Sequence, residues 1–153
     1  MLMYIGDFFK FQEKNNDSII LDSNLCDYKI KARKHLELNI KMSELADVTK
    51  CYKYWVGDEP SLDKKVILDK YISCLKHIIN LAIDDNYYIE DLSVEECENC
   101  LSDQFLGLYI DISDLIMSST QDHYITLLED YLSLGNSLDI SSDEMLNALK
   151  KSN

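Results

Sequence analysis

Residues that interrupt helices are scarce in this sequence, which has one proline and four glycines among 153 residues. Proline lacks an amide hydrogen and glycine readily takes the positive φ angles of tight turns, so an all-β fold with many short strands needs more of both. The scarcity therefore favours long helices. It also argues against phosphate binding by a glycine-rich loop, because neither GxGxxG nor GxxxxGK followed by Ser or Thr occurs.

Apolar residues recur at three- and four-residue steps in several stretches, as they do in amphipathic helices. We expect helices over residues 4–20, 28–56, 62–83, 93–117 and 121–134, and a last one from residue 141. The second of these carries one apolar stripe made of Leu38, Met42, Leu45, Tyr52 and Trp55. Capping boxes are expected at Ser93 with Glu96 and at Ser141 with Glu144, and Pro60 suits the first turn of the third helix. The prediction is an all-α bundle of five to six helices, with the second and third helices antiparallel.

The charge and the cysteines limit the setting in which the chain works. Acidic residues outnumber basic ones by 28 to 15, and a formal net charge of −13 disfavours direct binding to nucleic acid or to an anionic membrane. Five cysteines, an odd number, and the lack of a secretory pattern at the N-terminus predict a cytoplasmic protein with free thiols. No stretch rich in Pro, Gly or Ser divides residues 1–153, so we expect a single domain.

Side chains with catalytic chemistry give few signals by themselves. Cys97 and Cys100 form one CxxC inside a predicted helix, without the second pair that a zinc site needs, and two free thiols are the better interpretation. His35, His77 and His123 are far apart in the sequence and no nucleophile motif accompanies them, which argues against a hydrolytic triad.

Four segments carry a resemblance to a known family: SELADVTKCYKYW (43–55), KKVILDKYISCLKHIINLAI (64–83), FFKFQEKNNDSI (8–19) and DYLSLGNSLDISSDEMLNALKKSN (130–153). Together they resemble the all-α dimeric dUTP diphosphatases of bacteriophages, relatives of the MazG-type nucleotide pyrophosphohydrolases. Gln12 and Asn16 match the Gln-x-x-x-Asn/Asp pattern of the family's first helix. The resemblance implies a homodimer of helical subunits.

The family's catalytic positions have changed in this chain. The family binds magnesium ions through Glu-x-x-Glu on one helix and Glu-x-x-Asp on the next, and the ions bridge the triphosphate and activate water. By the resemblance, these four positions are Lys41, Glu44, Lys70 and Ser73, so only one carboxylate remains. One carboxylate with two ammonium groups is a net positive set, and we expect no metal cofactor. Lys41, three residues before Glu44, and Lys70, across the helix pair, are both expected to act as counterions that neutralise this otherwise buried carboxylate.

Two alternative hypotheses retain nucleotide binding. A Mg²⁺-dependent dUTP diphosphatase, which releases dUMP and pyrophosphate, is sterically possible if Glu44, Asp47 and Asp69 form a substitute ligand set. A metal-independent nucleotide sensor is the other alternative, with Lys41 or Lys70 meeting the phosphates directly. The resemblance assigns nucleotide binding to four positions: Gln12, Asn16, Trp55 and His77.

The main hypothesis is a catalytically inactive, phage- or prophage-encoded homodimer that acts in the host cytoplasm by binding a protein. Some phage dUTPases of this fold are thought to bind repressors of mobile elements, so the resemblance implies a DNA-binding repressor as the partner. An acidic surface suits such a basic partner, or it serves solubility alone. The sequence leaves both interpretations of the charge open.

Overall fold

The computed structural model describes residues 1–15, 19–58 and 61–151, and most of these residues are helical. Their elements, in chain order, are β1 (Leu2–Tyr4), α1 (Gly6–Asn15), α2 (Asp27–Thr49), α3 (Lys64–Asp84), β2 (Asp91–Ser93), α4 (Leu101–Met117), α5 (Gln121–Ser137) and α6 (Ser142–Lys151). The prediction of an all-α fold with five to six helices is confirmed. The two short strands were not predicted.

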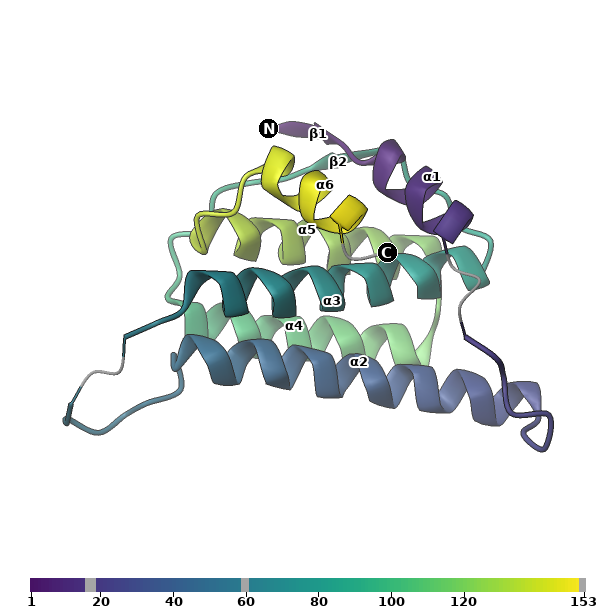
Figure 1. Cartoon of the computed structure of the whole chain (residues 1–153), viewed down its shortest axis with the longest axis horizontal. Helices are drawn as coiled ribbons and strands as arrows, with labels where there is room; N and C mark the ends of the chain where they lie inside the picture. Colours follow the sequence, from purple (N-terminus) through teal and green to yellow (C-terminus); the bar gives the residue numbers. More distant parts are fainter. Residues whose placement is uncertain (16–18, 59–60, 152–153) are drawn as a thin grey trace.

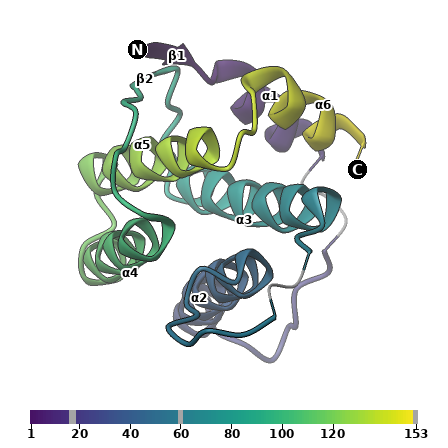
Figure 2. The same ribbon diagram turned by 90° about the vertical axis from the view of Figure 1, so that its left-hand side faces the viewer.

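Four helices, α2 to α5, form the body of the molecule (Figure 1). Helix α3 packs against α2 and α5, and α4 packs against the same two helices. The four helices therefore form a square in end view (Figure 2). Helices α1 and α6 lie over α3, beside the strand pair. The second and third helices pack antiparallel, as expected (Figure 1). Within the described residues, no helix is both long enough and apolar enough to cross a membrane.

Helix α3 lies at the centre because it is apolar on most of its circumference. Its buried residues are Ile67, Tyr71, Ile72, Cys74, Leu75, His77, Ile78, Ile79, Leu81 and Ala82. Burial of one Leu or Ile side chain stabilises a fold by about 1.5–3 kcal/mol, so this helix supplies a large share of the stability. Only narrow strips of α3 remain for polar side chains.

A pair of tyrosines joins α3 to α5. The rings of Tyr71 and Tyr131 stack with centroids 4.6 Å apart and an interplanar angle of 8°. The hydroxyl of Tyr71 donates to the carbonyl oxygen of Tyr131 at 3.0 Å, and the hydroxyl of Tyr131 donates to the carbonyl oxygen of Tyr71 at 2.8 Å. Burial raises the pKa of both phenols, so they remain protonated donors. A Cβ atom at Gly135 would overlap the Tyr71 hydroxyl, so glycine is needed there for close approach.

That glycine does not end its helix, so the predicted helix over 121–134 was too short. Helix α5 continues through Gly135 to Ser137. The first predicted helix, 4–20, was wrong at both ends. Its first residue belongs to β1, which pairs antiparallel with β2, and Ile5 donates from its amide to the carbonyl of Glu90 at 2.7 Å. Helix α1 ends at Asn15, and Asn16 lies outside the described residues.

The predicted start of the fourth helix at Ser93 was also wrong. Ser93 ends β2, and its amide donates to a carboxylate oxygen of Glu129 on α5 at 3.1 Å instead of opening a capping box with Glu96. Helix α4 begins at Leu101. The capping box at the last helix is confirmed: the amide of Ser141 donates to Glu144 Oε2 at 2.8 Å, and the amide of Glu144 donates to Ser141 Oγ at 3.2 Å.

The second predicted helix, 28–56, ends earlier than expected. Helix α2 stops at Thr49, and Lys50 takes a left-handed conformation with φ of 57°. Tyr52 and Trp55 therefore leave the buried stripe and are about half exposed, whereas Leu38, Met42 and Leu45 are buried as expected. Helix α3 begins two residues later than the predicted 62, because the Asp63 side chain accepts hydrogen bonds from the amides of Lys65 and Val66. The position expected for Pro60 lies outside the described residues.

Two carboxyl groups face each other where α4 packs on α5. Asp111 of α4 lies against Asp130 of α5, and Oδ2 of Asp111 is buried. Burial, a hydrogen bond with Asp130 and the negative charges of Asp130 and Asp114 raise the pKa of Asp111 to about 7. The ordinary value is about 3.9, so the folded state holds this proton more tightly than the unfolded chain. The resulting stabilisation is complete below about pH 4 and is lost as the pH rises through about 7.

The Asp111→Asn variant is therefore expected to be more stable than the parent at pH 8, by about 1 kcal/mol after allowance for solvent screening of this partly exposed group. At about pH 4, where the stabilisation is nearly complete, the two proteins are expected to unfold alike. Thermal unfolding at both pH values checks this, with Glu98→Gln as a control at an exposed carboxylate. An equal change in melting temperature at the two pH values would contradict the assignment.

Candidate functional site

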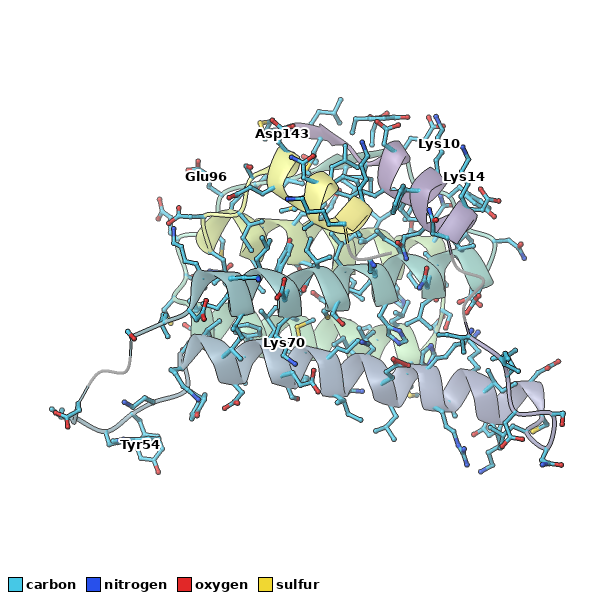
Figure 3. The ribbon with its side chains drawn as sticks, viewed as in Figure 1. Lys10, Lys14, Tyr54, Lys70, Glu96 and Asp143 are labelled. Atoms are coloured by element: carbon cyan, nitrogen blue, oxygen red, sulfur yellow. The ribbon has the colours of Figure 1, made fainter. Side chains whose placement is uncertain are left out.

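The four positions that the resemblance assigns to metal ligands lie along the contact between α2 and α3, which we call the α2–α3 seam. Lys41 and Glu44 come from α2, and Lys70 and Ser73 come from α3. Lys41 Nζ donates to Ser73 Oγ at 2.8 Å, and Lys70 Nζ lies 3.3 Å from Glu44 Oε2. Figure 3 shows Lys70 between the two helices. The structure therefore brings the four residues together as two contacts that cross the seam.

The expected pairing of Lys70 with Glu44 is confirmed, but its environment differs from the expectation. The Glu44 side chain is 48% exposed and the Lys70 side chain is 40% exposed. An ion pair this exposed contributes about 0–1 kcal/mol, because water screens the charges and both side chains lose entropy. The argument that a buried carboxylate must be neutralised therefore does not hold for Glu44.

Lys41 is the less exposed of the two lysines, with 24% of its side chain accessible. Besides Ser73, its ammonium lies 3.8 Å from Glu37 Oε2, one turn earlier on the same helix. Ser73 and Glu37 are thus the partners of Lys41, in place of Glu44. The Lys41 side chain thus crosses the seam from α2 to a residue of α3.

The substitute ligand set is not assembled. Asp47 accepts a hydrogen bond from the hydroxyl of Tyr52 at 3.1 Å and pairs with Lys50 at 3.4 Å, near the end of α2. Asp69 lines cavities on the α6 side of α3, away from Glu44. No group of three or more His, Cys, Asp or Glu side chains in the described residues is placed to hold a metal ion. The three carboxylates do not converge.

Of the positions expected to bind the nucleotide, the structure brings Gln12 and His77 close to one cavity. Gln12 is buried on α1 and donates from Nε2 to Oδ1 of Asn80 on α3 at 3.1 Å. Its own Oε1 is buried and has no hydrogen-bond partner among the described residues. Asn80 and His77 line one cavity of about 240 Å³ between α2 and α3, together with Lys34 and Glu37. His77 therefore lines this cavity, and Gln12 lies near it because it is hydrogen-bonded to Asn80 in the cavity wall.

The buried histidines in this region are held in the neutral form. His77 donates from Nε2 to the carbonyl oxygen of Lys34 at 2.7 Å, and its Nδ1 lies 3.7 Å from Glu37. Burial lowers the pKa of His77, and the nearby ammonium of Lys41 acts in the same direction. Burial also lowers the pKa of His35, one helical turn from Lys31. Neither imidazole adds a positive charge to the seam near neutral pH.

Trp55 is not brought to this cavity. It lies in the loop after α2, in edge contact with Tyr54 at a centroid distance of 5.1 Å and with the Lys53 ammonium 5.6 Å from its ring centre. His77 contacts Lys34, and roughly 22 Å of helix separates Lys34 from the end of α2. Figure 3 shows Tyr54 on this projecting loop, at one end of the molecule.

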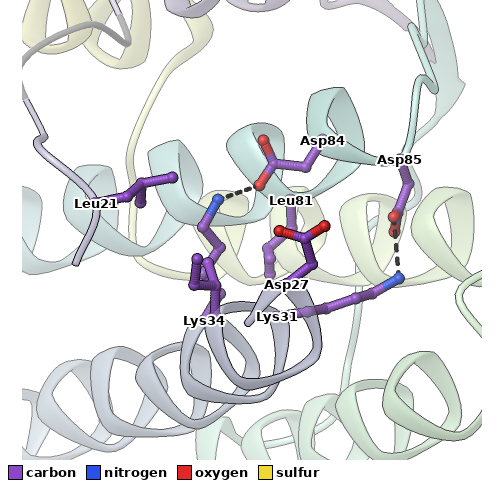
Figure 4. A pocket seen from close by; sticks show the side chains of 8 residues that line it. Leu21, Asp27, Lys31, Lys34, Leu81, Asp84 and Asp85 are labelled. Atoms are coloured by element: carbon purple, nitrogen blue, oxygen red, sulfur yellow. Dashed lines mark hydrogen bonds and ion pairs between the residues drawn. The ribbon is translucent and has the colours of Figure 1, made fainter. Parts of the chain in front are cut away.

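A second cluster at the other end of the seam was not predicted. Lys31 pairs with Asp85 at 3.0 Å, and Lys34 pairs with Asp84, beside a cavity of about 320 Å³ (Figure 4). The hydroxyl of Tyr124 on α5 donates to Asp85 as well. Two lysines three residues apart on one helix, with two adjacent aspartates at the end of the next, are the sequence signal that could have revealed these pairs.

The sequence predicted that the CxxC pair lies inside a helix, and this prediction was wrong. Cys100 is the N-cap residue of α4, and Cys97 precedes it in the connection from β2. Both are free thiols, as are Cys26, Cys51 and Cys74. The prediction of free thiols is therefore confirmed, although the helix around them starts later.

Comparison with protein families gives a match over nearly the whole chain. A family model described as dUTPase matches residues 5–153. Searches of curated proteins and of solved structures return no match. The matched range includes both helices of the seam and the helix that carries Gln12.

Because the Lys70–Glu44 pair is exposed, its removal is expected to change the free energy of unfolding little. In a double-mutant cycle with Lys70→Met and Glu44→Gln, we expect a coupling energy below about 1 kcal/mol. Urea unfolding of the four proteins measures this, with the exposed α1 residue Lys10→Met as a control. A coupling of about 3–5 kcal/mol, typical of a broken buried pair, would show that the seam is desolvated.

Proposed function

Since the chain belongs to the dUTPase family, whose model spans residues 5–153, we propose that it keeps the family's helical scaffold without hydrolysing dUTP and acts by binding a protein. The proposal rests on one observation. At the four positions that the resemblance assigns to metal ligands, Lys41 contacts Ser73 and Lys70 contacts Glu44. Two ammonium groups and a hydroxyl stand in place of three carboxylates.

This donor set does not fit magnesium. Mg²⁺ takes six oxygen ligands in near-octahedral geometry and, in proteins, draws its charge compensation from carboxylates and phosphates. The seam offers the single carboxylate of Glu44, and the ammonium of Lys70 lies 3.3 Å from it, where it repels a cation. Lys41 adds a second positive charge beside Ser73. No catalytic step through a metal follows from these residues.

Retention of the scaffold without its donor set supports a role in recognition. In this proposal the protein is phage- or prophage-encoded and its partner is a basic, DNA-binding repressor of a mobile element. The formal net charge of −13 supports a basic partner, since opposite charges speed association and favour complementary surfaces. The assignment of such a partner comes from the family resemblance.

A homodimer is part of the same proposal, and rows of exposed apolar side chains support it. Leu36 and Ile40 lie four residues apart on α2, and Leu106, Ile110 and Met117 follow one face of α4. Each of these five side chains is at least half exposed. Large exposed apolar groups at helical spacing are typical of a surface that a partner covers.

The two rows adjoin one another. Ser43, one turn beyond Ile40 on α2, contacts the hydroxyl of Tyr109, which is the residue before Ile110 on α4. Helices α2 and α4 pack together in the square of Figure 2. The rows therefore form one apolar surface across both helices, and a second copy of the chain is its proposed occupant.

Charge on this surface is expected to prevent dimerisation. The Leu106→Glu and Ile110→Glu double variant should run as a monomer in light scattering, while the parent runs as a dimer, because burial of two carboxylates costs several kcal/mol. Val56→Glu serves as a control, since Val56 is fully exposed in the loop after α2. A monomeric parent at high concentration would contradict the dimer.

The absence of hydrolysis is tested by pyrophosphate release from dUTP with Mg²⁺ or Mn²⁺. We expect none from the parent, because its donor set repels the metal. A Lys41→Glu, Lys70→Glu and Ser73→Asp triple variant restores four carboxylates and is expected to bind Mg²⁺. Turnover by the parent that Glu44→Gln abolishes would overturn the proposal.

A separate experiment tests the protein-binding role. Protein retained from host lysate by the tagged chain is identified, purified and tested for DNA binding with and without the chain in a gel-shift assay. A direct complex that releases the partner from DNA supports the proposal. Retention of no protein above the level of the unloaded resin would count against it.

A further inference from the structure

The connection between β2 and α4 places two thiols three residues apart at the start of a helix. Cys100 is exposed and is the N-cap residue of α4, and Cys97 is partly buried. Figure 3 shows Glu96, the residue before Cys97, at the edge of the molecule. Neither thiol belongs to the α2–α3 seam or to the apolar surface proposed for the dimer.

Side chains of α4 and α5 hold this connection at two points. On α5, Ser133 Oγ donates to the carbonyl oxygen of Glu95 at 2.6 Å. On α4, Gln104 Nε2 donates to the carbonyl oxygen of Asn99 at 2.9 Å and to Ser137 Oγ of α5 at 3.1 Å. A segment whose backbone is already held loses less conformational entropy when a further bond closes it.

The course of the backbone favours a short distance between the two thiols. Three residues of fully extended chain span about 10–11 Å, and a disulfide needs about 4.4–6.8 Å between its Cα atoms. The chain is not fully extended here, because it bends at Asn99, between Cys97 and Cys100. The Cys100 sulfur lies 3.2 Å from Ser102 Oγ, a weak hydrogen bond that exchange can replace.

Cys26 provides a contrast within the same chain. It is also exposed, and it is the N-cap residue of α2 with the same extended backbone as Cys100. The next cysteine along the chain is Cys51, and roughly 34 Å of helix α2 lies between the two. The two exposed N-cap thiols therefore differ in whether a second thiol is three residues away.

We propose that Cys97 and Cys100 are a redox site that forms a reversible disulfide by exchange with a low-molecular-weight disulfide such as oxidised glutathione. The thiolate of Cys100, the more exposed of the two, attacks one sulfur of oxidised glutathione and releases one glutathione thiolate. The thiolate of Cys97 then attacks the Cys100 sulfur of this mixed disulfide and releases the second glutathione. Overall, the two protein thiols lose two hydrogens, and oxidised glutathione becomes two molecules of glutathione.

The disulfide joins the N-cap residue of α4 to the connection that precedes it. Oxidation therefore restrains the start of this helix, which carries Leu106 and Ile110 of the apolar surface. The inference goes beyond the proposed function, because it uses no residue of the seam and requires no nucleotide.

The test is mass spectrometry of the full-length protein after equilibration with reduced and oxidised glutathione at several ratios. Free thiols are blocked with N-ethylmaleimide before digestion. In the oxidised parent, we expect the peptide that contains Cys97 and Cys100 to lose about 2 Da, the mass of two hydrogens, and to take up no blocking group. Dithiothreitol should restore both thiols.

Variants distinguish the two steps of the exchange. In Cys97→Ser, the reaction should stop at a mixed disulfide of Cys100 with glutathione, as we expect at Cys26 in the parent. Cys26→Ser is the matched control and should form the Cys97–Cys100 disulfide at the same glutathione ratio as the parent. Thermal unfolding confirms that each variant is folded.

Three outcomes in the parent would overturn the site. One is a lasting mixed disulfide with glutathione on Cys97 or Cys100, and another is a bond from either residue to Cys26, to Cys51 or to a second chain. The third is a pair that stays reduced at every glutathione ratio. Pyrophosphate release and dimerisation do not enter this measurement, so its failure is distinct from failure of the proposed function.

Discussion

The burial of α3 is the constraint on which the rest of the structure depends. This helix contacts α1, α2, α5 and α6, and the stacked pair of Tyr71 and Tyr131 fixes it to α5. Each tyrosine hydroxyl donates to the backbone of the other residue, so neither polar group is buried without a partner. Polar chemistry on α3 is therefore confined to strips along the edges of its contacts.

That confinement separates groups that are close in sequence. Lys70 points to α2 and pairs with Glu44, while the adjacent Asp69 faces the cavities beside α6. Consecutive residues on a helix lie about 100° apart, so Asp69 and Lys70 are directed to different neighbours of α3. Ser73, three residues after Lys70, contacts Lys41 and also lines a cavity with Asp69 of α3 and Ala148 of α6.

The parts of the candidate site that lie within the long helices could be predicted from the sequence. The family resemblance placed Glu44 opposite Lys70 correctly, because both positions lie within helices that the structure keeps. The hydrogen bond from Lys41 to Ser73 was not predicted, since a flexible lysine side chain has several partners within reach. Trp55 was misplaced because the chain leaves α2 at Lys50, and a positive φ at a lysine has no sequence signal.

The sequence by itself determined the all-α class, the apolar faces of the helices and the capping box of Ser141 with Glu144, because each depends on contacts within one or two turns. Only the tertiary structure decided how the chain begins and where α5 ends. The first residues form a strand because β2 lies about 90 residues away along the chain and beside them in space. Helix α5 passes through Gly135 because Tyr71 of α3 occupies the space of a side chain there. Local periodicity carries no information about such long-range contacts.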